Sequence, residues 1–420
     1  MKKCFYIAAT GAFLLSATLV GQDLKGWIYS KETADKLTKG RSEFNYYEEK
    51  VAPYKLPGLL QTSSGKEIKT AAGWKNERRP ELMKLFTTNM FGKMPGTKYV
   101  LSFKLTEENP VALDGKATLK KVDILIESGG KSLVIHLYVF LPNLEKKVPV
   151  FLLIDNRSQD NIDPSRKIKS EFWPVEEAIE RGYGMAAFFN GDVDPDDYDG
   201  FKNGIHGLLD VNGRQDDSWG TLAAWAWGAQ RCLDYLLTDK RVDGRKVAVI
   251  GHSRGGKTAL WAGATDQRFG MVIANESGCG GSALARRKYG ETVARINTAF
   301  PHWFCTNFRQ YGGNEDNMPF DMHMLLSLIA PRPLYIDAAA DDLWGDPKGS
   351  YLSLFNAQPV YSLFHYPAQL PSDVPELDKQ VISGNIGFHI RAGEHNLKLK
   401  DWNFIMDFAD NVWGKKQAYK

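Results

Sequence analysis

Short apolar runs alternate with longer segments of helical spacing over most of the chain beyond residue 100. Continuously apolar runs of strand length occupy residues 148–154 and 184–189, and short runs rich in strand-forming residues occupy 246–250, 270–274 and 333–338. Residues 219–237 carry apolar side chains at helical spacing. Continuous apolar strands that alternate with helices are typical of a parallel sheet covered on both faces. We therefore predict an α/β fold with a mostly parallel central sheet and helices on both sides.

The start and the end of this pattern indicate how the chain is divided into an N-terminal extension and a main domain. Residues 134–141 alternate as a strand does, and residues 387–391 form a last strand that precedes a helix through Trp402 and Phe408. Residues 74–86 have helical spacing after Pro80. We expect an N-terminal extension packed on the core over residues 22–100 and a catalytic domain over residues 101–420.

The first residues have the pattern of a targeting segment. Lys2 and Lys3 precede an apolar stretch that runs from Phe5 to Val20, and polar residues follow it. The stretch is too short and too weakly flanked for a stable membrane span, so we predict a secretory signal over residues 1–21 rather than an uncleaved anchor. The protein is then secreted or periplasmic, with no stable membrane insertion after cleavage.

Charge and cysteine content narrow the function classes. The 420 residues include 53 Lys and Arg and 50 Asp and Glu, so the net charge is only +3 with neutral histidines. Such a small net charge gives no strong electrostatic field that would favour a nucleic acid partner. Cys232, Cys279 and Cys305 follow the signal and show no zinc-binding spacing, so we expect buried free thiols. We expect no metal, no cofactor and a monomer. The acidic residues 192–200 miss the EF-hand spacing and are interpreted as a solvated loop.

One string of residues fits two unrelated motifs. Gly251-x-Ser253-x-Gly255 after a strand and before a helix is a nucleophile elbow. The overlapping Gly251-x-x-x-x-Gly256-Lys257-Thr258 is a P-loop, in which Lys257 would bind phosphates. Both motifs predict a strand, a turn and a helix. A secreted protein meets little nucleoside triphosphate, and several strands precede this string, so the elbow is favoured.

The elbow requires an acid and then a histidine downstream. His395 follows the last predicted strand and precedes a helix, where a general base is needed, whereas His323 lies in an apolar helical stretch and is expected to be a core residue. Two acids compete. Glu276 ends the strand after the elbow, and Asp342 follows the next strand, at the usual position for this fold.

With these residues in place, the chain resembles the bacterial glucuronoyl esterases of the carbohydrate esterases, from about Trp74 to the C-terminus. The matching segments are residues 251–257, 275–281, 300–304 and 330–333, Asp342-x-Trp344 and Gly393-x-His395. Several motifs in this order are far more specific than the elbow alone. The resemblance implies an α/β-hydrolase fold and a serine esterase.

The resemblance also implies a role for each residue. Ser253 matches the nucleophile, His395 the base, and Arg254 the arginine of the oxyanion hole. Glu276 matches the family's unusual acid and Asp342 the usual one, and the division between them stays open. Lys257, Glu291 and Trp344 match residues that bind the sugar. The implied substrate is a 4-O-methyl-D-glucuronoyl ester that links glucuronoxylan to a lignin alcohol.

Three alternatives stay open at this point. An acetylxylan or other carbohydrate esterase could use the same scaffold, although Lys257, Glu291 and Trp344 favour a uronate. A P-loop nucleotide-binding protein is disfavoured by context. A carbohydrate-binding relative without activity is disfavoured by the complete set of triad residues.

Overall fold

A computed structural model of the chain describes residues 26–366 and 368–414, and the predicted signal over residues 1–21 lies outside this part. The described residues form a ten-stranded sheet in the order β1-β2-β3-β5-β4-β6-β7-β8-β10-β9. Its strands are β1 (Val100–Ala112), β2 (Ala117–Ser128), β3 (Lys131–Pro142), β4 (Val148–Asp155), β5 (Gly184–Phe189), β6 (Val242–His252), β7 (Met271–Asn275), β8 (Leu334–Ala339), β9 (Gln380–Ser383) and β10 (Ile386–Arg391). Each strand predicted from an apolar run is present.

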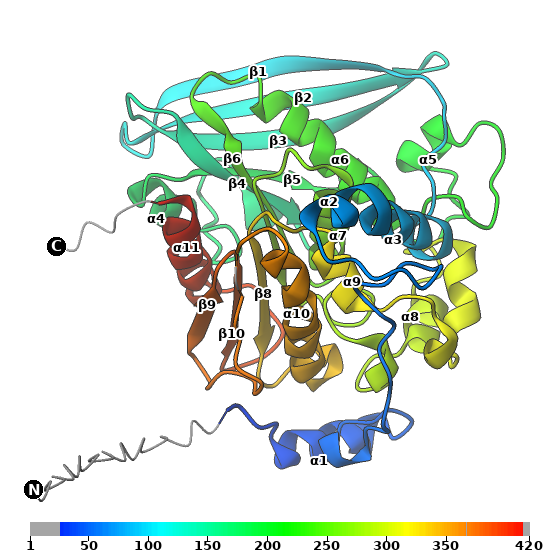
Figure 1. Cartoon of the computed structure of the whole chain (residues 1–420). Coiled ribbons are helices and arrows are strands. Elements are labelled where there is room, and N and C mark those ends of the chain that lie inside the picture. Colours follow the sequence, from blue (N-terminus) through cyan, green and yellow to red (C-terminus); the bar gives the residue numbers. More distant parts are fainter. Residues whose placement is uncertain (1–25, 367, 415–420) are drawn as a thin grey trace, which may run out of the picture.

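The centre of the sheet is parallel and its edges are antiparallel. The central set, β5-β4-β6-β7-β8-β10, is parallel throughout. Strands β1, β2 and β3 form an antiparallel meander that joins β5, and β9 pairs antiparallel with β10. The long meander strands extend the sheet at one end of the molecule (Figure 1). This mixed sheet agrees with the predicted mostly parallel centre.

Helices cover both faces of the sheet, as the apolar runs predicted (Figure 1). They are α1 (Lys31–Gly40), α2 (Ala71–Gly73), α3 (Arg79–Phe86), α4 (Val175–Glu180), α5 (Gly204–Leu209), α6 (Thr221–Leu236), α7 (Arg254–Thr265), α8 (Val293–Ala299), α9 (Met322–Ser327), α10 (Pro347–Ser362) and α11 (Leu399–Trp413). Alternate side chains of β4 point to opposite faces. Leu152 belongs to the core that contains α6, α7, α9 and α10, whereas Leu153 packs with α4 and α11.

The helical segment near Pro80 is longer than the sequence analysis predicted. It begins at Ala71, ahead of the proline, and passes through a π-helical turn (Trp74–Arg78), α3 and a second π-helical turn (Thr87–Phe91). A proline is tolerated in a first helical turn, where its missing N–H costs least, and Pro80 lies in the first turn of α3. The wider turn before it lets the helix continue through the proline.

This segment packs directly on the helix that follows the elbow. The ring of Phe91 stacks on Trp261 of α7, with centroids 4.3 Å apart and planes at 7°. Arg79 Nη2 donates a hydrogen bond of 2.7 Å to the carbonyl oxygen of Ala264, near the end of α7. The N-terminal part of the chain therefore braces α7 from outside the sheet.

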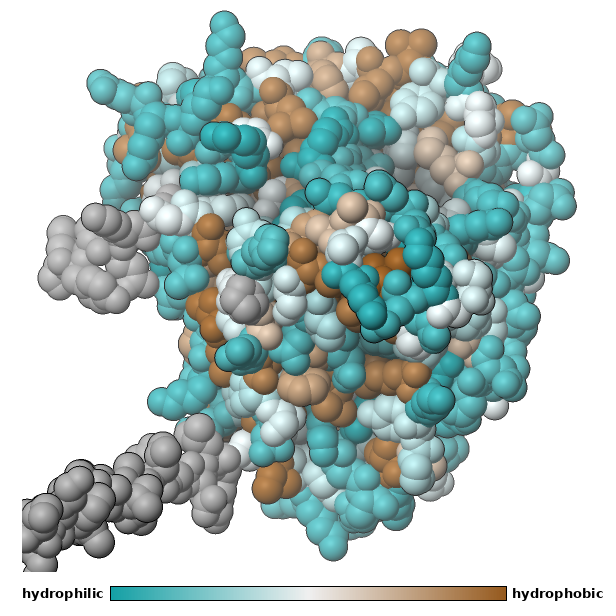
Figure 2. Space-filling view, in the orientation of Figure 1, coloured by the Kyte–Doolittle hydropathy of each residue, from teal (hydrophilic) through white to brown (hydrophobic). Residues whose placement is uncertain are grey.

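The three cysteines of the described chain, Cys232, Cys279 and Cys305, are buried free thiols, as expected. In the described part of the chain, every helix is too short or too polar to cross a bilayer. Hydrophilic residues cover most of the face in Figure 2, and apolar residues lie between them in small groups.

We expect Phe91→Ala to lower the free energy of unfolding by about 3–5 kcal/mol, because it opens a cavity against Trp261 and removes a stacked ring. Chemical denaturation with near-ultraviolet circular dichroism measures the loss. Val111→Ala, on an exposed position of β1, is the control and should change stability by less than about 0.5 kcal/mol. Equal losses in both variants would contradict the bracing role.

Candidate active site

Ser253 lies in the strained turn that the elbow predicts. It separates β6 from α7 and has φ 56° and ψ −122°, a backbone conformation that costs on the order of 1–3 kcal/mol for a residue with a side chain. A Cβ atom at Gly251 would lie 2.1 Å from the carbonyl oxygen of Gly255, so glycine is required for the tight turn. The turn holds the Ser253 hydroxyl at the carboxyl end of a central strand.

Parallel pairing brings the predicted acids and base to the same edge of the sheet. His252 of β6 lies opposite Asn275 of β7, so Ser253 and Glu276 leave neighbouring strands side by side. Glu276 also has a positive φ of 46°. Asp342 follows β8 and His395 follows β10, which pairs in parallel with β8. The four groups thus come from the ends of four successive strands in the sheet.

Both candidate acids contact the imidazole of His395. Its Nδ1 lies 2.7 Å from Asp342 Oδ2 and 2.9 Å from Glu276 Oε2. Burial by itself lowers the pKa of His395, but the hydrogen bonds to the two carboxylates outweigh it and raise this pKa to about 9. The arrangement makes His395 a more strongly basic group than an ordinary histidine.

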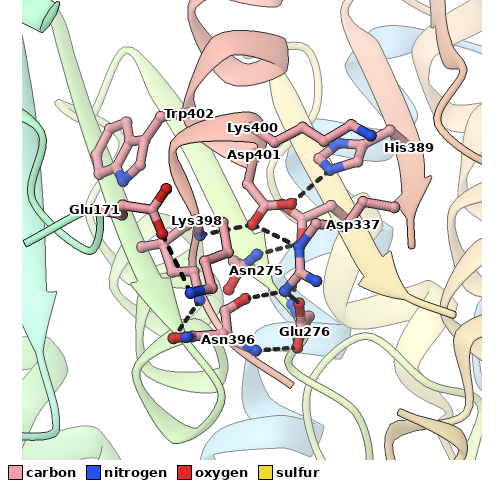
Figure 3. A network of polar contacts seen from close by, with 12 residues as sticks. Glu171, Asn275, Glu276, Asp337, His389, Asn396, Lys398, Lys400, Asp401 and Trp402 are labelled. Atoms are coloured by element: carbon pink, nitrogen blue, oxygen red, sulfur yellow. Dashed lines mark hydrogen bonds and ion pairs between the residues drawn. The ribbon is translucent and has the colours of Figure 1, made fainter. Parts of the chain in front are cut away.

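Glu276 is held from several sides in a buried network of polar groups (Figure 3). Its Oε2 accepts a hydrogen bond of 2.9 Å from the backbone N–H of Asn396, and its Oε1 accepts one of 2.6 Å from Arg391 Nη2. Burial raises the pKa of Glu276 to about 7, although the hydrogen bond from His395 opposes this shift. Asp401 and His389 continue the network behind it (Figure 3).

Arg254 is the first residue of α7, and its guanidinium lies beside the elbow. Nη1 donates to the carbonyl oxygen of Asn156 at 3.3 Å and lies 3.2 Å from Asp196 Oδ2. The guanidinium carbon is 5.2 Å from the centroid of the Trp303 ring. Its Nε is buried and has no hydrogen-bond partner among the residues that the structure describes.

The acidic loop that the sequence analysis interpreted as solvated is solvated only in part, because Asp196 and Asp197 are exposed whereas Asp194 is buried. Asp194 is 4% exposed and accepts a hydrogen bond of 2.7 Å from Thr221 Oγ1. Asp196 accepts a hydrogen bond of 2.7 Å from Trp303 Nε1 and also faces Arg254. Because the charges have partners supplied by distant residues, the loop's composition alone could not reveal its burial.

The residues predicted to bind the sugar lie next to one another. Lys257 is buried, and its Nζ donates a hydrogen bond of 2.7 Å to the carbonyl oxygen of Ser277. Burial lowers the pKa of Lys257, while the charge of Glu291 opposes that shift. The backbone N–H of Glu291 donates to the carbonyl oxygen of Trp344 at 2.9 Å. A buried cation and an acid therefore face the same space.

The N-terminal segment adds a residue that the sequence analysis missed. The guanidinium of Arg41 lies over the Trp344 ring, 4.4 Å from its centroid, and Phe44 meets the same ring edge-on at 4.8 Å. Nothing in the local sequence marks Arg41, because an exposed arginine after a short helix is an ordinary surface residue. One face of the Trp344 indole is thus covered by a cation.

Every residue that the sequence analysis assigned to the site lines one cavity of about 340 Å³. The further residues of its wall are Arg41, Gly278, Phe300, Trp303 and Gly345. The cavity combines a strained serine, a paired histidine, a buried lysine, a partly buried arginine and aromatic rings. Such a set can bind a polar ligand and attack a carbonyl group.

The same local structure disfavours the P-loop. In a P-loop the backbone N–H groups are free to bind phosphate. Here the N–H of Ser253 donates to Asn275, and the N–H groups of Gly256 and Lys257 both donate to Ser253. The Thr258 hydroxyl donates a hydrogen bond to the carbonyl oxygen of Arg254. These backbone and side-chain groups are therefore already hydrogen-bonded within the protein.

Two clusters among the described residues have metal-binding composition, one formed by His252, Glu276 and His395 and the other by Asp337, His389 and Asp401. Each already lies against a guanidinium. Arg157 Nη2 is 2.8 Å from His252 Nε2, and Arg391 pairs with Glu276 and Asp401. These contacts indicate hydrogen-bonded networks rather than metal sites.

Comparison with known proteins connects this site to a family. Residues 124–364 match the family model described as "Glucuronyl esterase, fungi". Carbohydrate esterase MZ0003, from an unknown prokaryotic organism, is 39% identical over 399 residues, which cover 88% of this chain and 92% of that protein. The 4-O-methyl-glucuronoyl methylesterase of Schizophyllum commune is 27% identical over 329 residues, 74% of each chain.

A solved structure agrees with these matches. The glucuronoyl esterase from Solibacter usitatus superposes with a TM-score of 0.82 at 39% identity, over 87% of this chain and all of that one. The fold is therefore the α/β-hydrolase fold that the resemblance implied. The chain is a carboxylic ester hydrolase and belongs to the glucuronoyl esterase family.

Proposed function

We propose that the protein is a serine esterase that hydrolyses 4-O-methyl-D-glucuronoyl esters between glucuronoxylan and lignin alcohols, by way of an acyl-enzyme. The observation that carries the proposal is the shared cavity of Ser253, the doubly paired His395 and the buried Lys257. The relative in Schizophyllum commune is named for the same chemistry.

Acylation uses the elbow and the paired histidine. Ser253 Oγ attacks the ester carbonyl carbon while His395 Nε2 takes its proton. The carboxylates at Nδ1 hold the ring in the required tautomer and stabilise the imidazolium that forms. The carbonyl oxygen becomes an oxyanion beside the N–H and guanidinium groups of Arg254, and a donor of this kind is worth about 3 kcal/mol.

Collapse of the tetrahedral intermediate breaks the bond to the alcohol. His395 gives its proton to the departing alkoxide oxygen, so the alcohol leaves neutral. Water then attacks the acyl carbon, with His395 again as base, and releases Ser253 and the uronate. In this scheme Lys257 and Glu291 hydrogen-bond the sugar hydroxyls, and a face of the sugar packs on the Trp344 indole, one side of which Arg41 covers.

The proposal includes export of the protein from the cytoplasm. A polymer-bound ester lies outside the cell, and the apolar segment after Lys2 and Lys3 has the pattern of a cleaved secretory signal. Secretion or transfer to the periplasm would bring the enzyme to such a substrate.

Ser253→Ala should abolish hydrolysis of benzyl glucuronate, with a loss of at least about 10⁴-fold in kcat, because no other group can form the acyl-enzyme. Ser350→Ala removes a buried hydroxyl that bonds Ser282 outside the cavity and should keep activity near wild type. Hydrolysis of p-nitrophenyl acetate by the wild type without glucuronate turnover would instead indicate another carbohydrate esterase.

Lys257→Met should weaken the uronate preference. We expect kcat/KM for benzyl glucuronate to fall about 10–100-fold, the value of a charged hydrogen bond, while p-nitrophenyl acetate turnover changes little. Lys348→Met removes an amine that pairs with Glu48 at 3.0 Å and does not line the cavity, so it serves as the control. Equal losses on both esters would contradict a sugar-binding role.

The pH dependence of kcat/KM should follow the titration of His395. Only neutral His395 can accept the Ser253 proton, so kcat/KM should rise with pH along a limb near pH 9, set by the raised pKa of His395. Asp342→Asn removes a carboxylate that favours the imidazolium, so the pKa of His395 falls and the limb moves to lower pH. Asp341→Asn, on the exposed neighbour, should leave it in place. A limb that both variants leave unmoved would exclude His395 as the titrating base.

A further inference from the structure

Arg391, at the end of β10, makes an unusual number of contacts with the groups that surround the catalytic histidine. It is only 3% exposed. Its Nη2 donates to Glu276 Oε1 at 2.6 Å and to the carbonyl oxygens of Glu394 at 2.9 Å and Asn396 at 2.6 Å. These two carbonyl groups belong to the residues on either side of His395. A single guanidinium nitrogen therefore contacts both the Glu276 carboxylate and the backbone that flanks His395.

A second contact ties the same two parts together. The backbone N–H of Asn396 donates to Glu276 Oε2 at 2.9 Å, and that oxygen also lies 2.9 Å from His395 Nδ1. Arg391 and Asn396 thus bind the two oxygens of Glu276 and orient the carboxylate plane toward the imidazole. Glu276 and Asn396 lie in the lower part of the network in Figure 3.

The far side of Arg391 is anchored to the scaffold. Nε donates to Asp401 Oδ2 at 2.9 Å, and Asp401 Oδ1 lies 2.9 Å from His389 Nε2. The same Oδ2 accepts the backbone N–H of Lys398 at 2.8 Å, at the start of α11. The guanidinium is therefore fixed between β10 and α11. Because its N–H donors lie in one plane at fixed angles, a fixed guanidinium also fixes the orientation of the Glu276 carboxylate that it binds.

We propose that Arg391 is a positioning residue of the reaction, which acts through the Glu276 carboxylate to hold the His395 imidazole in the geometry that general base catalysis needs. This inference rests on the proposed serine mechanism. Asp342 reaches His395 from a different loop, and in the described part of the chain it forms no hydrogen bond or ion pair with Arg391. Arg391 therefore acts on one of the two acids, and its effect depends on whether that acid is present.

The test is a double-mutant cycle on benzyl glucuronate. Arg391→Met should lower kcat about 100-fold, as a displacement near 1 Å can, with KM within about threefold, because the sugar contacts lie elsewhere in the cavity. Adding Arg391→Met to Glu276→Gln should change kcat by no more than about twofold, whereas adding it to Asp342→Asn should cost the full factor. Equal factors in both backgrounds would overturn the proposal.

Loss of folding is controlled with a second buried arginine. Arg286 donates to Phe320 O at 2.8 Å and pairs with Asp321 at 3.2 Å, with both side chains at most 4% exposed, and it does not line the cavity. Arg286→Met should destabilise the protein similarly while kcat per folded molecule stays near wild type. A matching loss of kcat in Arg286→Met would reduce Arg391 to a structural residue.

Arg391→Lys covers the case in which the methionine variant does not fold. A lysine keeps the charge beside Glu276 and Asp401 but is a point donor that cannot reach all the acceptors at once. We expect an intermediate loss of about tenfold in kcat, again absent in the Glu276→Gln background. An unchanged kcat in Arg391→Lys would also overturn the proposal. Failure of the serine mechanism itself would show separately, as activity retained by Ser253→Ala.

Discussion

The parallel pairing of β6, β7, β8 and β10 is the constraint on which the active site depends. Parallel strands end at one edge of a sheet, so residues that follow them meet although they are far apart in the chain. The register places Ser253 directly beside Glu276, and both residues turn out of their strands with positive φ. Such strain persists only because the buried strands on either side hold the backbone in place.

Charge burial is the second feature that organises the site. Glu276, Asp401 and the fully buried Asp337 lie close together, and burial raises the pKa of Asp337 well above its usual value. Arg391 supplies the positive charge that lets its two partner carboxylates stay buried. Removing one member of such a set leaves an unpaired buried charge, which is why these networks are costly to break.

The N-terminal segment supports the site from two directions. Residues 71–91 brace α7 through Phe91 and Arg79, on the side away from the elbow. The segment near Tyr46 packs against the loops of Glu291 and Trp344, where the backbone N–H of Gly290 donates to the carbonyl oxygen of Asn45 at 2.8 Å. A stretch that looks like an appendage in the sequence therefore contributes both stability and a wall of the cavity.

The sequence by itself determined the strands of the parallel centre, the elbow and the order of nucleophile, acids and base, because apolar runs and a glycine-flanked serine are local signals. The long β1 and β2, the helical start ahead of Pro80, and α10 with an internal Pro359 escaped those signals, since tertiary packing overrides local propensity there. Only the tertiary structure decided that both Glu276 and Asp342 reach His395, that Arg41 covers Trp344, that Asp196 pairs with Arg254, and that Arg391 is a buried partner of Glu276. These contacts join residues from separate strands and loops, and their distances depend on strand register and helix packing rather than on neighbours in the chain.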